Sequence, residues 1–430
     1  MKRTQTIRLV AALSAAVLAG ACDLDVTNPN SPTEEAVITD VNGVVALAVG
    51  IQGQFAQSIE DWVVTGALAT DEWGTRTRSL LSYQAMFTGQ NFENTYTLVA
   101  TPYQNIYAIA KSANTLLAAS GGVGLGSSFQ AGINSLAKLF KGMALGMGAM
   151  QYEHLAPDIA VGGAVLLPRA DVRDTVLALL ESARSDIAGV TDADLASFNS
   201  RVLGSGINLR ATIDAMLARY YLLDQQYQKA IDAAARVPAT VLSTLTYPAP
   251  TTNPIWALAI DIQYVGGTYN FVNAAETGDK RPGYWLLTTT APVAGNPGDS
   301  LSYTLKKYGT QNESFPLWLP DEMKLIQAEA YARLANLPQA RTLINQVRTQ
   351  ASSAVDEPVA GLPALTDAQL PDLNTILRQI GYERRYELFQ QALRWEDTRR
   401  LPVTSSVTFQ FLPLPSTECR DNPNAAQYCD

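Results

Sequence analysis

The sequence predicts a mostly α-helical fold in which pairs of helices pack beside long, irregular loops rich in aromatic side chains. Apolar residues recur at spacings of three and four along several segments, which is the pattern of amphipathic helices. In two of these segments small residues alternate with large ones, as they do where paired helices pack closely. Elsewhere the helical spacing fades and Pro, Gly, Thr and Asn become frequent, which is typical of loops.

The expected helices are spread along the whole chain. The spacing predicts them at residues 36–57, 103–119, 130–152, 171–188, 209–237, 321–351 and 376–400. Gly142, Gly146 and Gly148 would weaken the third of these helices if it stood alone. We expect these glycines to let neighbouring helices approach closely.

Two of the segments contain a break, so each predicts a pair of helices. The breaks fall near residues 224–226 and at residues 336–338. Small residues that alternate with large ones across such a pair resemble the tetratricopeptide repeat. The sequence therefore predicts tetratricopeptide-like helix pairs as the scaffold.

Two loop regions gather aromatic side chains. Residues 62–103 and 238–320 both contain tryptophans, tyrosines and phenylalanines without helical spacing. Long irregular loops in a compact domain are usually functional. We expect the region 238–320 to be the ligand-binding part of the molecule.

The N-terminal residues predict export. Lys2, Arg3 and Arg8 precede an apolar stretch over residues 9–18, and small residues then lead into Cys22. A basic start, a short apolar segment and a small-residue exit are the parts of a secretory signal. The cysteine directly after that exit resembles the lipobox of bacterial lipoproteins, in which this residue carries the lipid.

These features divide the chain into three parts. We expect a lipoprotein signal peptide over residues 1–21, a lipidated tether over 22–33 and a single domain over 34–430. No apolar run reaches the roughly 18 residues that a membrane-spanning helix needs, so a lipid would be the only contact with the membrane. The alternative is an ordinary cleaved signal followed by a chance cysteine.

Composition excludes several classes of site. A formal net charge of −9 argues against a protein that binds nucleic acid by neutralising phosphates. His154 is the only histidine and there are three cysteines, so a metal centre built on several His or Cys ligands is not available. We predict no metal and no cofactor. In an oxidising compartment, and with Cys22 lipidated, Cys419 and Cys429 are expected to form a disulfide.

Three stretches together resemble the SusD/RagB family of outer-membrane nutrient-binding lipoproteins. The first is the exported start with its lipobox. The second is the helix pair with an AEA core at residues 322–330 and the IN-x-VR pattern at 340–348. The third is the C-terminal series of ERRYEL at 383–388, RWEDTRR at 394–400 and LPLPSTE from 412. Their order along the chain is that of the family.

The resemblance implies both a fold and a role. It implies a SusD-like helical domain on a lipoprotein of the bacterial outer membrane that faces the cell surface. It also implies that the protein captures oligosaccharides, or peptides, for a SusC-like TonB-dependent transporter. Members of this family bind their ligands and do not catalyse reactions on them.

A sugar-binding site needs flat aromatic rings and convergent polar groups. Trp73 is our first candidate platform, with Asp71 and Arg76 as hydrogen-bonding partners from the same short loop. The second candidate group consists of Tyr284, Trp285 and Arg281. The alternative for each ring is that it packs a loop onto the helices.

Other polar residues have structural explanations. The arginines of residues 384–400 alternate with Glu and Asp at spacings that allow ion pairs, so we interpret them as architecture. His154 lies beside Glu153, but we interpret it as a surface or satisfied core histidine.

Two rival functions remain open at this point. One is a tetratricopeptide-type scaffold that binds only proteins. The other is a glycoside hydrolase, which needs only a pair of carboxylates among the 40 acidic residues. No motif points to such a pair.

Overall fold

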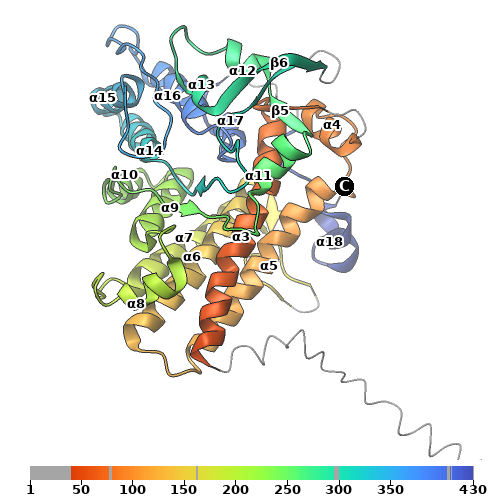
Figure 1. Cartoon of the computed structure of the whole chain (residues 1–430), viewed down its shortest axis with the longest axis vertical. Coiled ribbons are helices and arrows are strands. Elements are labelled where there is room, and N and C mark those ends of the chain that lie inside the picture. Colours follow the sequence, from red (N-terminus) through yellow and green to blue (C-terminus); the bar gives the residue numbers. More distant parts are fainter. Residues whose placement is uncertain are drawn as a thin grey trace, which may run out of the picture.

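The structure of the chain is a computed structural model that describes residues 40–76, 80–160, 163–294, 300–403, 407 and 409–429. The predicted signal peptide, the tether and Cys22 lie outside these residues. Within them the fold is mostly helical, as predicted, and the helices form the lower and left parts of the molecule in Figure 1.

Four long helices form the first part of the scaffold. They are α3 (Val41–Ala69), α5 (Thr97–Ser120), α6 (Ser127–Gln151) and α7 (Arg169–Asp186), and each packs on the next along the chain. Asp40 caps α3 by accepting a hydrogen bond of 2.9 Å from the backbone N–H of Gly43. The helix runs twelve residues beyond the predicted end at 57, because Trp62 and Leu68 belong to the core rather than to a loop.

The glycines of α6 allow close packing, as predicted. A Cβ atom at Gly146 would overlap the hydroxyl group of Tyr220, and one at Gly148 would lie 2.6 Å from Cδ1 of Ile106. A larger residue at Gly146 would displace the ring of Tyr220 on α9, and one at Gly148 would displace the end of the Ile106 side chain on α5.

The helix pairs follow. They are α9 (Leu209–Leu223) with α10 (Tyr227–Ala235) and α14 (Pro320–Arg333) with α15 (Leu337–Arg348), and contacts between α10 and α14 join the two pairs. Both predicted breaks are confirmed. Gln225 and Ala335 adopt left-handed φ angles of 60° and 63° that end the first helix of each pair.

The last predicted helix, 376–400, is wrong as a single element. It divides into α16 (Leu373–Glu387) and α17 (Arg394–Arg400). Gln390 and Ala392 between them have φ angles of 63° and 58°, which a continuous right-handed helix does not allow. The turn brings Ala392 against Gly66 of α3.

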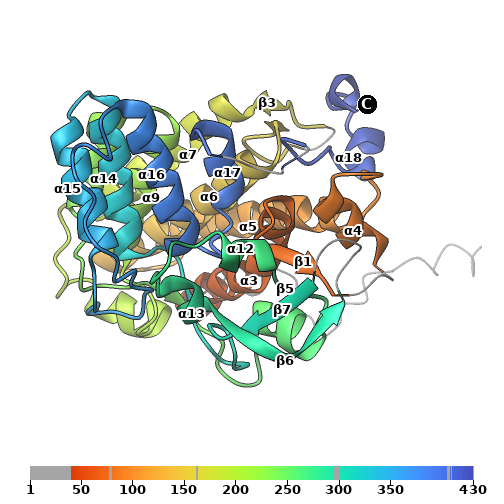
Figure 2. The same cartoon turned by 90° about the horizontal axis from the view of Figure 1, so that it is seen from above.

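The region 238–320 contains more regular structure than predicted. Its strands β5 (Val265–Gly267), β6 (Leu286–Ala294) and β7 (Ser300–Leu305) join β1 (Trp73–Thr75) in an antiparallel sheet of order β1-β5-β7-β6. Figure 2 shows this sheet on the side of the molecule away from α15.

Short elements complete the fold. They are α4 (Leu81–Thr88), β2 (His154–Leu155), β3 (Leu167–Pro168), α8 (Ala196–Phe198), η1 (Asn199–Leu203), β4 (Thr244–Leu245), α11 (Pro254–Trp256), η2 (Ala257–Asp261), α12 (Tyr269–Asn273), α13 (Arg281–Trp285), β8 (Phe315–Pro316), α18 (Ser416–Asp421) and η3 (Ala426–Tyr428). In the view of Figure 2 α18 lies next to α4.

The core extends through the helices and under the sheet. Its largest fully buried side chains include five tryptophans, namely Trp62, Trp73, Trp285, Trp318 and Trp395. A smaller apolar cluster fills the space between α14, α15 and α16. None of the helices in the described ranges has the length and apolar character needed to cross a membrane.

Candidate functional site

The first predicted platform, Trp73, belongs to the core. Its side chain is 0% exposed, and its backbone pairs with Gly267 of β5 in the antiparallel sheet. The prediction that this ring stacks on a ligand is therefore corrected: in this structure a ligand cannot reach it. The alternative, that the ring packs a loop onto the helices, describes its environment.

The two residues predicted to assist Trp73 lie on either side of β1. The backbone carbonyl of Asp71 accepts a hydrogen bond of 2.6 Å from the hydroxyl of Thr268, and the backbone N–H of Arg76 donates to the carbonyl of Tyr264 at 2.8 Å. Both side chains are partly exposed, and burial lowers the pKa of Arg76. The backbones of both residues thus fasten the predicted loop to the segment around β5.

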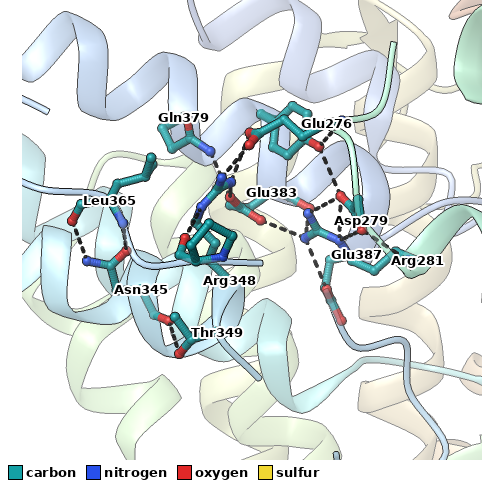
Figure 3. Close-up of polar contacts among 12 residues, drawn as sticks. Glu276, Asp279, Arg281, Asn345, Arg348, Thr349, Leu365, Gln379, Glu383 and Glu387 are labelled. Carbon is teal, nitrogen blue, oxygen red and sulfur yellow. Dashed lines mark hydrogen bonds and ion pairs between the residues drawn. The ribbon is translucent and has the colours of Figure 1, made fainter. Parts of the chain in front are cut away.

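In the second predicted group, Arg281 forms buried ion pairs. The guanidinium group is 0% exposed and lies 2.7 Å from Asp279 and 2.7 Å from Glu383, with Glu387 at 3.4 Å. Figure 3 shows these carboxylates converging on it from α16 and the loop before α13, beside a second arginine, Arg348. Arg281 is therefore a structural residue, which corrects its predicted role in ligand contact.

Trp285 is also buried, whereas Tyr284 is not. The indole N–H of Trp285 donates to the carbonyl of Tyr386 at 2.8 Å, which fixes α13 on α16 and leaves no free face for a ligand. Tyr284 is half-buried and donates to a carboxylate oxygen of Asp356 at 2.8 Å. Lys307 pairs with the same carboxylate. Tyr284 is thus the predicted ring that keeps exposed surface.

A groove elsewhere collects several half-exposed aromatic rings. It encloses about 440 Å³ and lies where the loop after α4, the start of β2, the segment before α18 and η3 meet. We call it the aromatic groove; it is lined by Gly89, Phe92, Glu153, His154, Phe409, Gln410, Phe411, Leu412, Pro413, Leu414 and Tyr428.

Backbone hydrogen bonds position the C-terminal wall of the aromatic groove. The N–H of Leu412 donates to the carbonyl of Gln151 at 2.8 Å, and the guanidinium of Arg399 donates to the carbonyls of Gln410 and Met150, each at 2.8 Å. These contacts fasten the extended segment to the end of α6. The segment can therefore present its side chains without belonging to a sheet.

The disulfide holds the opposite wall. Cys419 and Cys429 are bonded, with their Cα atoms 5.8 Å apart, so η3 is tied back to α18. Tyr428 precedes the second cysteine, and its ring stacks on His154 with centroids 4.0 Å apart and an interplanar angle of 18°. This contact gives His154 a place in the groove rather than in the core.

The remaining rings are arranged as pairs. Phe92 stacks on Phe409 with centroids 5.2 Å apart, and Phe411 lies under the guanidinium group of Arg399 at 4.4 Å. Glu153 and Gln410 are exposed at the rim. Aromatic faces beside a carboxylate and an amide can stack on apolar CH groups while hydrogen-bonding to hydroxyls.

None of the residues that line the aromatic groove is among those predicted to contact the ligand. Phe92 fell within the aromatic region 62–103, but Phe409, Phe411 and Tyr428 were not singled out. The available signal was the Phe-Gln-Phe alternation at 409–411, because alternate residues of an extended chain share a side. Nothing local indicated that Phe92 and Tyr428 would meet the same groove.

One group of carboxylates in the described ranges has the spacing of metal ligands. Oxygen atoms of Asp321, Glu357 and Glu387 lie within 4.8 Å of one another, and all three residues are buried. The pKa of Asp321 is raised to about 6, mainly by burial and also by the charge of the neighbouring Glu357, against the lowering effect of Lys324. The ammonium group of Lys324 contacts Asp321 at 2.5 Å, so a protein cation already compensates part of this charge.

Comparisons with known proteins agree with this architecture. The fold resembles a SusD superfamily protein from Bacteroides vulgatus ATCC 8482 (15% identity, 91% of this chain and 98% of that chain, TM-score 0.69). It also resembles a SusD-like carbohydrate binding protein from the same strain (15% identity, 83% and 82%, TM-score 0.64) and surface glycan-binding protein A from Bacteroides uniformis (14% identity, 87% and 98%, TM-score 0.67). No curated protein matches the chain in sequence.

The family match falls on the part of the chain that carries the C-terminal motifs. Residues 304–428 match the model of the SusD family, and this range includes α14 to α17 and two walls of the aromatic groove. The chain thus matches the SusD family model in its C-terminal part and shares the fold of SusD superfamily structures over nine tenths of its length.

Proposed function

We propose that the protein is a cell-surface lipoprotein that captures oligosaccharides, or peptides, for a SusC-like TonB-dependent transporter of the outer membrane. The observation that carries this proposal is the aromatic groove, in which stacked rings border a carboxylate and an amide. Two of the structurally similar proteins are described as binding carbohydrate or glycan, and we extend that role to this chain.

The aromatic groove favours binding over hydrolysis. A glycoside hydrolase uses two carboxylates on either side of the scissile bond. Among the described residues that line the groove, Glu153 is the one carboxylate. The groove also favours a small ligand over a purely protein-binding scaffold, since its rings line a cavity instead of being buried in the fold.

The membrane attachment forms part of the same proposal. Cys22 would carry the lipid, and residues 22–33 would connect it to α3, which begins at Val41. A binding protein tethered in this way stays at the surface where its transporter lies.

Isothermal titration calorimetry of the purified protein against neutral oligosaccharides and oligopeptides tests the proposal. We expect saturable binding of one class, with no new reducing ends or free amines. Tyr428→Ala should weaken binding about tenfold or more, because the ring would provide a stacking face in the groove. Tyr269→Ala, which removes an exposed ring on α12, is the matched control and should leave affinity unchanged.

A Tyr284→Ala variant decides between the two candidate sites. If it weakens binding and Tyr428→Ala does not, the ligand occupies the region 238–320 instead of the aromatic groove. Release of products would contradict the binding role. The absence of binding across the whole panel would favour a protein-binding scaffold.

A further inference from the structure

A second cavity has a different chemistry from the aromatic groove. It encloses about 420 Å³ and lies between α7, the turn from α9 to α10, α14 and α17. We call it the arginine pocket; it is lined by Arg169, Arg173, Leu222, Leu223, Gln225, Tyr227, Glu329, Arg333, Glu396, Arg399 and Arg400.

The lining of the arginine pocket is strongly cationic. It combines five guanidinium groups with two carboxylates, in a chain whose net charge is −9. Each guanidinium group offers five N–H donors, so the pocket holds far more donors than its two carboxylates can satisfy. Such an excess of fixed donors favours an anion with several acceptor oxygens.

The two carboxylates of the lining are already engaged. Glu396 accepts from Arg169 at 2.6 Å and from Arg399 at 2.6 Å. Glu329 pairs with Arg400, and Arg333 contacts it at 3.4 Å. These pairs hold four of the five guanidinium groups in place. Part of their donor capacity stays unused, since the buried Nε–H groups of Arg169, Arg333 and Arg400 have no hydrogen-bond partner among the described residues.

Arg173 has no hydrogen bond or ion pair with any residue in the described part of the chain. It lies one helical turn from Arg169 on α7, and like charges at this spacing destabilise a helix. Burial lowers the pKa of Arg173, and the charge of Arg169 lowers it further, whereas Glu396 raises it. An anion between the two arginines would relieve this repulsion.

Uncharged groups border the cations. Tyr227 and Gln225 come from the turn that joins α9 to α10, and Leu222 and Leu223 add apolar surface. A ligand that fits this lining carries an anionic group on a body with both hydroxyl and CH surfaces.

We propose that the arginine pocket binds the carboxylate or sulfate group of an acidic saccharide. The identity of the ligand as a saccharide rests on the proposed function, whereas the preference for an anion rests on the five guanidinium groups alone. The two cavities would then bind different parts of a ligand. The aromatic groove would bind neutral sugar units, and the arginine pocket would bind an acidic unit.

Calorimetric titration of the full chain in detergent tests this inference. The probes are sodium glucuronate, sodium sulfate and neutral glucose, at constant ionic strength set with chloride. We expect glucuronate and sulfate to bind saturably and glucose not to bind at the arginine pocket. Arg173→Gln should weaken the two anions about tenfold or more, because it removes the guanidinium group with no internal partner.

Arg184→Gln is the matched control. Arg184 lies on the same helix, α7, but pairs with Asp214 outside the arginine pocket. It should leave anion affinity unchanged, although the net charge changes by the same amount. The proposal would be overturned if Arg173→Gln and Arg184→Gln lost anion affinity equally. It would also be overturned if glucose bound as tightly as glucuronate and Arg173→Gln weakened that glucose binding. Arg333→Gln serves as the second pocket variant if Arg173→Gln unfolds at a lower temperature.

The outcomes separate this inference from the proposed function. Tyr428→Ala should leave glucuronate binding intact, because its ring lines the other cavity. If glucuronate binds but no oligosaccharide or oligopeptide of the panel does, the proposed function fails and the anion site stands. If sulfate binds and glucuronate does not, the pocket does not take a carboxylate, and that part of the proposal is wrong. If an acidic oligopeptide of the earlier panel binds at the pocket and neither glucuronate nor sulfate does, the saccharide assignment is wrong.

Discussion

Glu72 is a buried carboxylate next to the buried Trp73. It is 2% exposed, and its Oε1 atom has no hydrogen-bond partner among the described residues. Burial raises the pKa of Glu72 to about 8, although the charges of Arg394 and Arg385 and a backbone hydrogen bond from Gln390 oppose this rise. Glu72 is therefore largely protonated at neutral pH, as a buried carboxyl with incomplete pairing must be.

This raised pKa predicts how stability changes with pH. The ordinary pKa of 4.5 applies to the unfolded chain, so the folded state binds the proton more tightly. The corresponding stabilisation is complete below pH 4.5 and is lost as the pH rises to about 8. Over this span the free energy of unfolding should fall by on the order of 5 kcal/mol at most from this group.

The Glu72→Gln variant isolates the effect. Glutamine has the shape of the protonated acid and does not titrate, so the variant should match the natural protein near pH 5 and exceed its stability near pH 9. Urea unfolding of both proteins across this pH range measures the difference between their free energies of unfolding. Taking this difference removes the contribution of the other titrating groups, which the two proteins share. Parallel curves would contradict the assignment of a raised pKa to Glu72.

The residues around Trp73 show why its burial cannot be predicted from the local sequence. Asp71, Glu72 and Arg76 surround Trp73 in the sequence, and this polarity predicts an exposed ring. The structure buries it because β1 pairs with β5, whose residues follow almost two hundred positions later. A long-range strand pair of only three residues leaves no periodic signal.

At the scale of elements, the disulfide connects stability with the candidate site. It closes a loop of ten residues between α18 and η3, and Tyr428 lies within that loop. From the chain-entropy relation, such a crosslink stabilises the folded state by roughly 2–3 kcal/mol. Its larger effect would be local, because η3 has only three residues and few other contacts that hold it in place.

We expect the double variant Cys419→Ser/Cys429→Ser to lose ligand affinity more than overall stability. Releasing η3 frees the ring of Tyr428 from His154, so oligosaccharide binding should weaken by an amount similar to that caused by Tyr428→Ala. Calorimetry and thermal unfolding of the oxidised protein, the reduced protein and the variant provide the comparison. Reduction should have no further effect on the variant, and unchanged affinity in it would show that η3 contributes nothing to the site.

The helices differ in how far the sequence predicted them. The breaks after α9 and α14 were predictable, because turn-forming residues interrupt the apolar spacing there. The break between α16 and α17 was not, since residues 383–400 contain neither proline nor glycine. That turn depends on tertiary packing, where Ala392 meets Gly66 of α3 and Arg384 pairs with Asp397 at 2.8 Å.

At the scale of the whole molecule, charge is distributed unevenly. Buried arginines join distant elements, as Arg281 joins α13 to α16 and Arg219 joins α9 to Glu322 of α14 at 2.7 Å. The prediction that the arginines of residues 384–400 form ion pairs is confirmed for Arg384, Arg399 and Arg400. Among the described residues, no carboxylate forms an ion pair with Arg385 or Arg394. A chain with a negative net charge can therefore contain local cationic pockets, and the net charge does not predict them.

The fold was more predictable than the site for a physical reason. The family motifs are local strings at 322–348 and 383–418, and their order can be read directly from the chain. The aromatic groove instead combines Phe92, His154 and Tyr428, which come together only after the helices pack. The residues of such a site have no regular spacing along the chain, so the sequence alone does not predict it.

The attachment of the whole molecule to the membrane should depend on a single side chain. We propose that the Sγ atom of Cys22 carries the lipid, and the twelve residues 22–33 then form a polar tether that spans up to about 40 Å when extended. Cys22→Ser removes the acceptor, so the protein should leave the membrane fraction and lose the mass of the lipid. Ligand affinity should not change, because none of the described residues that line the aromatic groove precedes Gly89 in the sequence. Fractionation, mass spectrometry and calorimetry measure these three quantities, with Cys419→Ser/Cys429→Ser as the control that should remain at the membrane. A Cys22→Ser protein that still carried lipid would contradict the assignment, whereas one that lost ligand affinity would show that the tether takes part in binding.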